Sequence, residues 1–160
     1  MPEARPSTEP RTDTPTDVSR ASILLVDDHE QNLELLEAYL EDVGCRVRLA
    51  RDGVQAIHEV ESEQPDLIIL DVMMPRMSGF QVCREVKGNP TTRDIPIVMV
   101  TALSDVGDAE RAVECGADDF LTKPVHKLEL VTRVKVLLRY RLLKKQFDEA
   151  QAREKRERSS

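Results

Sequence analysis

A four-residue apolar run at 67–70, which ends in Asp71, constrains the fold of this chain more than any other feature. Four apolar residues are too few for a helix. Pro65 and Pro75 bound the segment, so the run predicts a strand buried on both faces. Asp71 would then stand at the carboxyl end of a central strand, where open parallel sheets bind their ligands. Considered alone, Asp71 fits a cap of the following turn as well as a functional carboxylate.

Composition restricts the class of protein. The chain has 160 residues, enough for one domain with a true core, and aromatic residues make up only 3%, so the core must be aliphatic. The net charge of −7 argues against a general nucleic-acid binder, which needs a basic surface. No apolar leader and no run of 18 apolar residues occurs, which predicts a cytoplasmic protein without membrane insertion.

The cysteines and histidines do not form recognisable ligand motifs. Three cysteines stand alone in their segments, so neither a zinc site nor a disulfide framework is expected, and reduced thiols are the default. We likewise expect the three histidines at the surface, outside any relay or metal site. These residues are Cys45, Cys83, Cys115, His29, His58 and His126.

Residues 1–20 contain four prolines among polar residues, which predicts a disordered tail. From residue 23 onward, short apolar runs alternate with segments of helical periodicity. Strands are predicted near 23–26, 46–50, 67–70, 97–100 and 118–122. The strand at 46–50 alternates in polarity, as an edge strand does. One predicted helix carries the stripe Leu33, Leu36, Leu40 and Val43, and the next carries Val54, Ile57 and Val60. Further helices are expected near 80–86, 105–114 and from residue 127 toward the C-terminus.

Strands that alternate with helices predict a parallel sheet covered on both faces. Five such units favour an α/β fold of the flavodoxin-like (βα)5 type, a doubly wound sheet in the order 2-1-3-4-5 with an extended C-terminal helix. We assign residues 21–139 to this domain and residues 140–160 to a helical extension.

Polar residues follow each central strand of the predicted sheet. Asp27 and Asp28 follow the first strand, Asp71 the third, Thr101 the fourth and Lys123 the fifth. Because the carboxyl ends of neighbouring parallel strands lie together, these five side chains are expected in one cleft. Separate helix caps would explain each residue singly but not their joint occurrence.

The expected cleft favours phosphoryl transfer. Two carboxylates about 4 Å apart repel by roughly 4 kcal/mol at an effective dielectric constant of 20, so three of them need a cation. A few hard oxygen ligands suit Mg²⁺ better than Ca²⁺. A carboxylate can attack phosphorus to form an acyl phosphate, and Mg²⁺ and a lysine stabilise the charge that is transferred. Asp71 is therefore predicted to accept phosphate.

Four motifs resemble the receiver domain of bacterial two-component response regulators: VDD at 26–28, LDVMMPRMSG at 70–79, VTA at 100–102 and FLTKP at 120–124. This resemblance implies that Asp71 is the phosphoacceptor, that Asp28 binds Mg²⁺ directly and that Asp27 holds metal-bound water. Asp71 and the backbone carbonyl of Met73 would complete the metal site. Lys123 would pair with the phosphoryl group.

The same resemblance implies a signalling switch. Thr101 would move toward the phosphoryl group and Phe120 would turn inward, while Pro124 matches the family's proline. A histidine kinase or phosphotransfer protein would be the donor. The output would pass through the face of the fourth helix, fifth strand and fifth helix, to a protein partner or a second copy. Charged residues on or near that face are Arg111, Asp118, Asp119 and Arg133. Beyond its own phosphorylation and dephosphorylation, no enzymatic activity is expected.

Two apolar residues, Met73 and Leu103, flank the expected path of attacking water. They predict a phosphorylated state that lasts minutes or longer.

The C-terminal extension has oppositely charged residues at helical spacing, such as Lys145 and Glu149, but its apolar residues fade after Leu143. It is consistent with a marginal dimer-forming helix or with a connector to an absent effector domain. The stretch from FLTKP onward also resembles receivers that precede diguanylate-cyclase domains.

Three alternatives stay open. The chain could be the receiver fragment of a larger regulator. An aspartyl-nucleophile phosphatase is disfavoured, because such enzymes usually carry a second Asp where Met73 stands. A DNA-binding transcription factor would need a basic helical module that is not found here.

Overall fold

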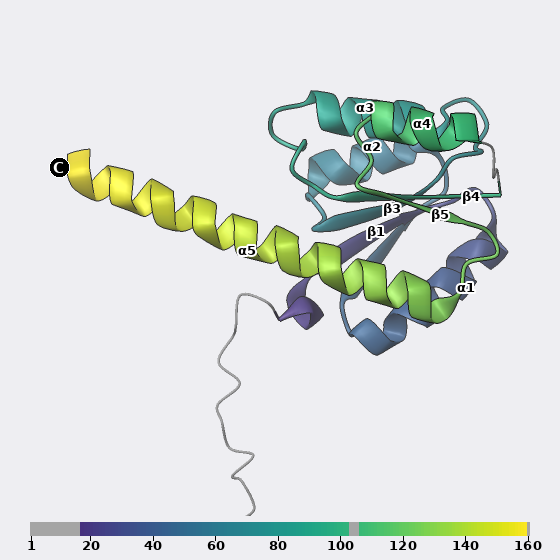
Figure 1. Ribbon diagram of the computed structural model, residues 1–160, viewed down its shortest axis with the longest axis horizontal. Coiled ribbons are helices and arrows are strands. Elements are labelled where there is room, and N and C mark those ends of the chain that lie inside the picture. The colour runs from purple at the N-terminus through teal and green to yellow at the C-terminus, as the bar shows by residue number, and fades with distance from the viewer. Residues whose placement is uncertain (1–16, 103–105, 160) are drawn as a thin grey trace, which may run out of the picture.

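The computed structural model describes residues 17–102 and 106–159, which form a parallel sheet between two layers of helices (Figure 1). The sheet has five strands in the order β2-β1-β3-β4-β5, as the sequence predicted. Their bounds are β1 Ser22–Val26, β2 Arg46–Ala50, β3 Leu67–Asp71, β4 Ile97–Thr101 and β5 Asp119–Thr122.

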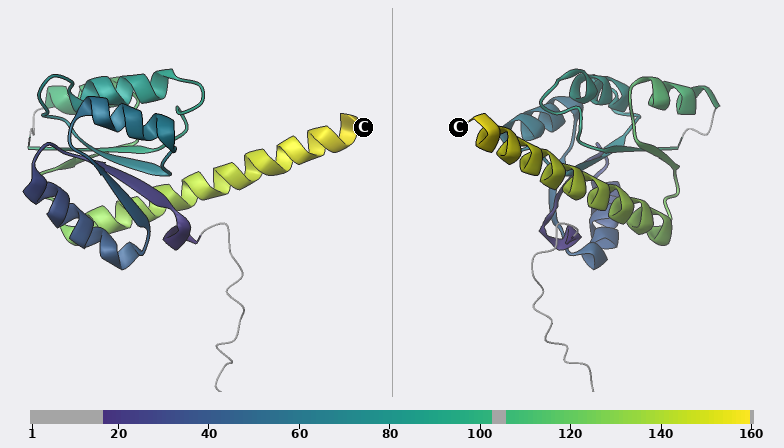
Figure 2. Two further views of the ribbon diagram at one scale, coloured as in Figure 1. Left: turned by 180° about the vertical axis from the view of Figure 1, so that it is seen from behind. Right: turned by 60° about the vertical axis from the view of Figure 1, so that its left-hand side comes forward.

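Helices cover both faces of this sheet, with α1 and α5 on one side and α2, α3 and α4 on the other (Figures 1 and 2). The helices are α1 Glu30–Leu40, α2 Gly53–Ser62, α3 Gly79–Gly88, α4 Val106–Glu114 and α5 Lys127–Ser159, with short 3-10 helices η1 Val18–Arg20 and η2 Glu41–Val43. The architecture is therefore the doubly wound α/β fold.

Alternate residues of the buried strands feed two aliphatic cores. In β3, Ile68 and Leu70 pack toward α2, α3 and α4, whereas Leu67 and Ile69 pack toward α1 and α5. All five residues of β3 are buried, which explains the unbroken apolar run in the sequence. The edge strand β2 is partly exposed, in agreement with its alternating polarity.

Local signals set the ends of several helices. Ser78 and Gln81 form a reciprocal capping box at the start of α3. The Asp52 side chain accepts a hydrogen bond from the Gln55 N–H at the start of α2. Gly44 ends η2 with φ of 78°, in the left-handed region that glycine adopts without strain. These signals fix where the chain turns back toward the sheet.

Two details of the sequence interpretation are wrong. Val54 is exposed, and Ala56 takes the inward position of α2 together with Val60, because Gly53, Ala56 and Val60 recur at spacings of three and four residues and so share one side of the helix. Residues 17–20 were assigned to the disordered tail, yet Val18–Arg20 forms η1, capped by Asp17. Val18 packs against the core on the α1–α5 side, which accounts for its order. Residues 1–16 lie outside the described residues.

Helix α5 continues without a break through the boundary predicted at residue 139 and projects beyond the sheet (Figure 1). Lys145 does not rely on the expected Glu149: its Nζ donates to Oδ1 of Asp66 over 2.6 Å. The other carboxylate oxygen of Asp66 accepts the Ser22 N–H over 2.9 Å. Asp66 therefore ties the extension to the start of β1. Within the described ranges, no helix is long and apolar enough to cross a membrane.

Candidate functional site

The carboxyl ends of the central strands bring the predicted polar residues together. Asp71 ends β3 and Thr101 ends β4, while Asp27 and Lys123 directly follow β1 and β5. The register places Val26 beside Leu70, Asp71 beside Val100, and Thr101 beside Thr122. Parallel strands in this register end at one edge of the sheet, so residues distant in the chain meet there.

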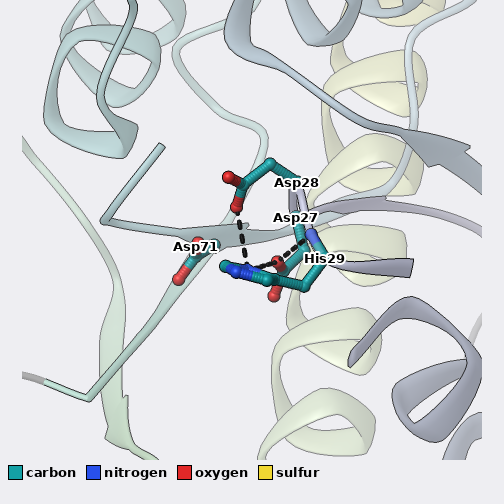
Figure 3. Close-up of side chains that lie close together, drawn as sticks. All are labelled: Asp27, Asp28, His29 and Asp71. Carbon is teal, nitrogen blue, oxygen red and sulfur yellow. Dashed lines mark hydrogen bonds and ion pairs between the residues drawn. The ribbon is translucent and has the colours of Figure 1, made fainter. Parts of the chain in front are cut away.

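Three carboxylates and one imidazole form the core of the site. Ligand atoms of Asp27, Asp28, His29 and Asp71 all lie within 4.8 Å of one another (Figure 3). Asp27 and Asp71 are buried, whereas the Asp28 side chain is 24% exposed. Three negatively charged carboxylates at this spacing repel one another, so the site favours a bound cation.

The side chain of Lys123 places its own positive charge among these carboxylates. Its Nζ lies 3.2 Å from Oδ1 of Asp71 and 3.3 Å from Oδ2 of Asp27. The following peptide bond, Lys123–Pro124, is cis. The ammonium group thus bridges two of the three carboxylates.

These surroundings change the protonation of both partners. Burial, and then the neighbouring Asp27 carboxylate, raise the pKa of Asp71 to about 6, although Lys123 opposes them. Burial acts to lower the pKa of Lys123, but the Asp71 and Asp27 carboxylates outweigh it and the pKa is raised. At neutral pH the site therefore holds an ionised but destabilised Asp71 beside a charged lysine.

The donor set fits a magnesium ion. Its oxygens are hard carboxylate ligands in small number, the type that Mg²⁺ prefers. Oδ1 of Asp28 is buried without a hydrogen bond, although Nδ1 of His29 lies 3.1 Å away. A buried carboxylate oxygen in this state is stabilised by a metal ion. Met73 lies in the loop after β3 with its side chain exposed, and the role expected for its backbone carbonyl stays a prediction.

His29 is the residue that the sequence interpretation missed. It is exposed, as expected, but its ring reaches the acidic cluster, and its backbone N–H donates to Oδ1 of Asp27 over 2.9 Å. Its position directly after the two aspartates was the available signal. His58 instead lines a groove with Asp52 and Arg76, away from the carboxylates.

Glycine is required where α3 meets the end of β3. A Cβ at Gly79 would stand 2.2 Å from the backbone oxygen of Asp71, which is closer than atoms can approach. Gly79 N–H donates to the Val72 carbonyl over 3.0 Å. The glycine in the loop motif therefore lets α3 start directly against the backbone of Asp71.

The two predicted switch residues lie on one face of the sheet. Thr101 is fully buried at the end of β4, and Phe120 is half-buried on β5, against the core on the α2–α4 side. Met99 pairs with Phe120 in the register and belongs to the same core. Because alternate residues share a face, Thr101 lies on this side too. Leu103 falls outside the described residues.

Charged residues expected on the output face are paired within the chain. Arg133 bonds Asp119 over 2.9 Å, and Lys87 bonds Asp118 over 2.9 Å. The Arg111 guanidinium lies 4.2 Å from the centroid of the Phe80 ring, a cation–π contact between α4 and α3. These pairs tie β5 and α4 to their neighbouring helices.

Comparison with known proteins agrees with this site. The family model of the response regulator receiver domain matches residues 23–135. Response regulator PleD of Caulobacter vibrioides is 48% identical over 84% of this chain and 29% of its own length. Response regulator MprA of Mycobacterium tuberculosis is 44% identical over 73% of this chain and 50% of its own length. The chain thus spans between about a third and a half of these relatives.

Solved structures give the same result. The receiver domain of a signal transduction histidine kinase from Syntrophus aciditrophicus is 44% identical, with a TM-score of 0.70 over 74% of this chain and 89% of that one. The receiver domain of the sensor histidine kinase PA1611 from Pseudomonas aeruginosa is 34% identical, with a TM-score of 0.69 over 74% of this chain and 98% of that one; it was solved with a magnesium ion in its active site cleft. The family match, the sheet order and the cluster of aspartates around Lys123 together show that this chain belongs to the response regulator receiver domain family.

Proposed function

We propose that this chain accepts a phosphoryl group on Asp71 in the presence of Mg²⁺ and passes the change to a protein partner. The observation that carries the proposal is the position of Lys123, which bonds the buried Asp71 carboxylate beside two further aspartates. Such a site can neutralise phosphoryl charge while a carboxylate oxygen of Asp71 attacks phosphorus and the bond from phosphorus to the donor breaks, which releases the donor's imidazole or, from acetyl phosphate, acetate.

Each residue has a distinct role in this proposal. Asp28 would hold Mg²⁺ directly and Asp27 would hold it through water, and Asp71 and the Met73 carbonyl would be its further ligands. The metal supplies charge neutralisation when bound. Lys123 moves from pairing two carboxylates to pairing the phosphoryl oxygens. The magnesium in the related PA1611 receiver domain supports this assignment.

The conformational switch starts at Thr101. A phosphoryl group on Asp71 attracts the Thr101 hydroxyl from the neighbouring strand, and the vacated space admits the ring of Phe120. The shared sheet face and strand register of these residues support the coupling. The local change then alters the α4–β5–α5 surface, as expected of an electrostatic event that biases two arrangements. A protein partner or a second copy reads this surface.

The donor is a histidine kinase or a phosphotransfer protein in the cytoplasm. A groove lined by Asn32, Tyr39 and Val125 opens between α1 and the β5–α5 loop, with Lys123 in its wall. The exposed Leu35 borders it and offers apolar contact area. A donor domain seated there would approach the acceptor carboxylate. The domain itself catalyses only its own phosphorylation and dephosphorylation.

The test uses acetyl phosphate as a small donor. The intact mass of the chain is measured with Mg²⁺, with EDTA, and in an Asp71→Asn variant. We expect the gain of one phosphoryl group only in the wild-type chain with Mg²⁺. A gain in Asp71→Asn, or rapid multiple turnover of a phosphoester, would contradict the proposal, and turnover would favour a phosphatase.

A further inference from the structure

Helix α5 carries apolar residues on two opposite sides. The inner side packs against the sheet and α1 through the buried residues Leu130, Val134 and Leu138. The outer side bears four large apolar residues that remain exposed: Val136 at 57%, Tyr140 at 62%, Leu143 at 48% and Phe147 at 61%. We call these four residues the outer stripe.

The outer stripe has the geometry of a helix-pairing seam. Its members follow one another at spacings of four, three and four residues, which aligns them along one side of a helix. From Val136 to Phe147 the seam extends about 16 Å along the axis, at 1.5 Å per residue. Single exposed apolar residues are normal on a protein surface, but four in consecutive seam positions form a continuous ridge.

The stripe lies where a partner can reach it. The segment of α5 that carries it continues onto the part of the helix that projects from the domain (Figure 1, and Figure 2, right). A bond from Lys145 to Asp66 holds the other side of this segment to the domain, and Lys144, beside the stripe, pairs with Asp94. The helix is therefore anchored with its outer stripe facing away from its own core.

Basic and neutral residues flank the stripe. One flank carries Arg139, Gln146 and Arg153, and the other carries Leu137, Lys144, Gln151 and Arg158. The α5 helix as a whole holds eleven Lys and Arg against five Asp and Glu, although the full chain has a net charge of −7. The positive charge of the chain is thus concentrated on this helix.

These flanks disfavour pairing with a second copy. In a parallel, in-register pair of α5 helices, Arg139 would face Lys144 and Arg153 would face Arg158 across the seam. An antiparallel pair would also set basic flanks against each other. Like charges in these positions oppose association.

We propose that the outer stripe is a docking surface for an acidic amphipathic helix of a partner protein. The partner would fit apolar residues between Tyr140, Leu143 and Phe147 and place Glu or Asp beside Arg139 and Arg153. Apolar contact area would give affinity, and the opposite charges would give selectivity and orientation. This surface is distinct from the cleft around Asp71, so it extends the proposed function without resting on it.

The test uses two synthetic helical peptides with Leu at the seam positions. One has Glu at both flanking positions and the other has Lys. Binding to the full chain is followed by fluorescence anisotropy without a phosphate donor, so the outcome is separate from phosphorylation at Asp71. Test variants are Leu143→Ser with Phe147→Ser, and Arg139→Glu with Arg153→Glu. Val54→Ser, at an exposed apolar residue on α2, is the control, and circular dichroism checks the fold of each variant.

We expect the Glu peptide to bind at least about tenfold more tightly than the Lys peptide, and raised salt to reduce the difference. The stripe variant loses binding, the control keeps it, and the charge-reversed variant prefers the Lys peptide. Failure of both peptides to bind, or equal affinities, overturns the proposal. If the chain alone forms a dimer, and the double variant Leu143→Ser with Phe147→Ser dissociates that dimer, the stripe pairs with a second copy and the proposal is overturned. Tighter binding to anionic lipid vesicles than to the Glu peptide would also overturn the proposal.

Discussion

Nζ of Lys123 lies 3.2 Å from Oδ1 of Asp71, although 52 residues separate them in the chain. The same nitrogen lies 3.3 Å from Oδ2 of Asp27. One ammonium group thus stabilises two buried carboxylates that would otherwise repel each other. The predictions below follow from this cluster and from the anchoring of α5.

Removal of the lysine should destabilise the domain. In EDTA at neutral pH, we expect Lys123→Gln to lower the free energy of unfolding by about 1–3 kcal/mol, because two buried carboxylates lose their cation. Urea denaturation measures the change. Lys127→Gln, which breaks an exposed pair with Asp42, is the matched control and should change stability much less. Equal effects of the two substitutions would contradict the assigned role of Lys123.

The raised pKa of Asp71 predicts that an uncharged residue at this position stabilises the fold by an amount that depends on pH. The folded chain holds the Asp71 proton up to a pKa of about 6, whereas the ordinary pKa of an aspartate is 3.8. Ionisation of Asp71 therefore destabilises the folded state. This destabilisation is absent when the pH is below the pKa of the unfolded chain and is fully present when the pH is above the pKa of the folded chain. In EDTA, Asp71→Asn should gain roughly 1–3 kcal/mol of unfolding free energy at about pH 7.5 and almost none near pH 4. A gain that is constant with pH would refute this account.

Asp28 and Asp27 should respond differently to substitution. Asp28 makes no hydrogen bond through its buried Oδ1, whereas Asp27 accepts one from the His29 N–H and one from Lys123. In EDTA we expect Asp28→Asn to stabilise the fold by up to about 2 kcal/mol through reduced repulsion, and Asp27→Asn to give little or no gain. Thermal unfolding with and without Mg²⁺ checks this, and Mg²⁺ should stabilise both variants less than the wild type.

Loss of the Asp66 carboxylate should destabilise the domain more than loss of its partner Lys145. Asp66→Ala leaves the buried Ser22 N–H without its acceptor and releases Lys145, so we expect a loss of roughly 1–3 kcal/mol. Lys145→Ala removes only a partly exposed ion pair and should cost less than about 1 kcal/mol. Hydrogen exchange should report faster exchange in residues 140–150 of α5 for both variants. Protection unchanged in both would show that other contacts hold the extension.

The exposed Met73 predicts a slow loss of phosphate. Its apolar side chain stands beside the expected path of water, so the phosphorylated chain should persist for minutes or longer. Met73→Asn should shorten the lifetime. Intact mass measured over time after removal of acetyl phosphate tests both statements. Decay of the wild-type phosphate within seconds would disprove the protective role.

Much of this fold follows from the pattern of apolar runs. Residues 67–70 and 97–100 are buried on both sides of the sheet, so an unbroken apolar sequence was enough to identify them as central strands. Polar residues at the ends of such strands must meet at one edge of the sheet, so the sequence alone predicts that Asp71, Thr101 and Lys123 lie together. Strand position alone determines that convergence.

Features that depend on side-chain direction were not predictable. His29 lies at the start of α1, and only the path of the loop decides that its ring turns toward Asp28. Asp66 and Lys145 are 79 residues apart and show no shared periodicity. Tertiary packing sets each of these details.

The most direct test of the central claim locates the phosphate. The chain is treated with acetyl phosphate and Mg²⁺, the acyl phosphate is reduced with borohydride, and the modified residue is identified by tandem mass spectrometry of peptides. We predict a single modified aspartate, Asp71, with none when EDTA replaces Mg²⁺. Modification at Asp27 or Asp28, or labelling that is independent of Mg²⁺, would contradict the account.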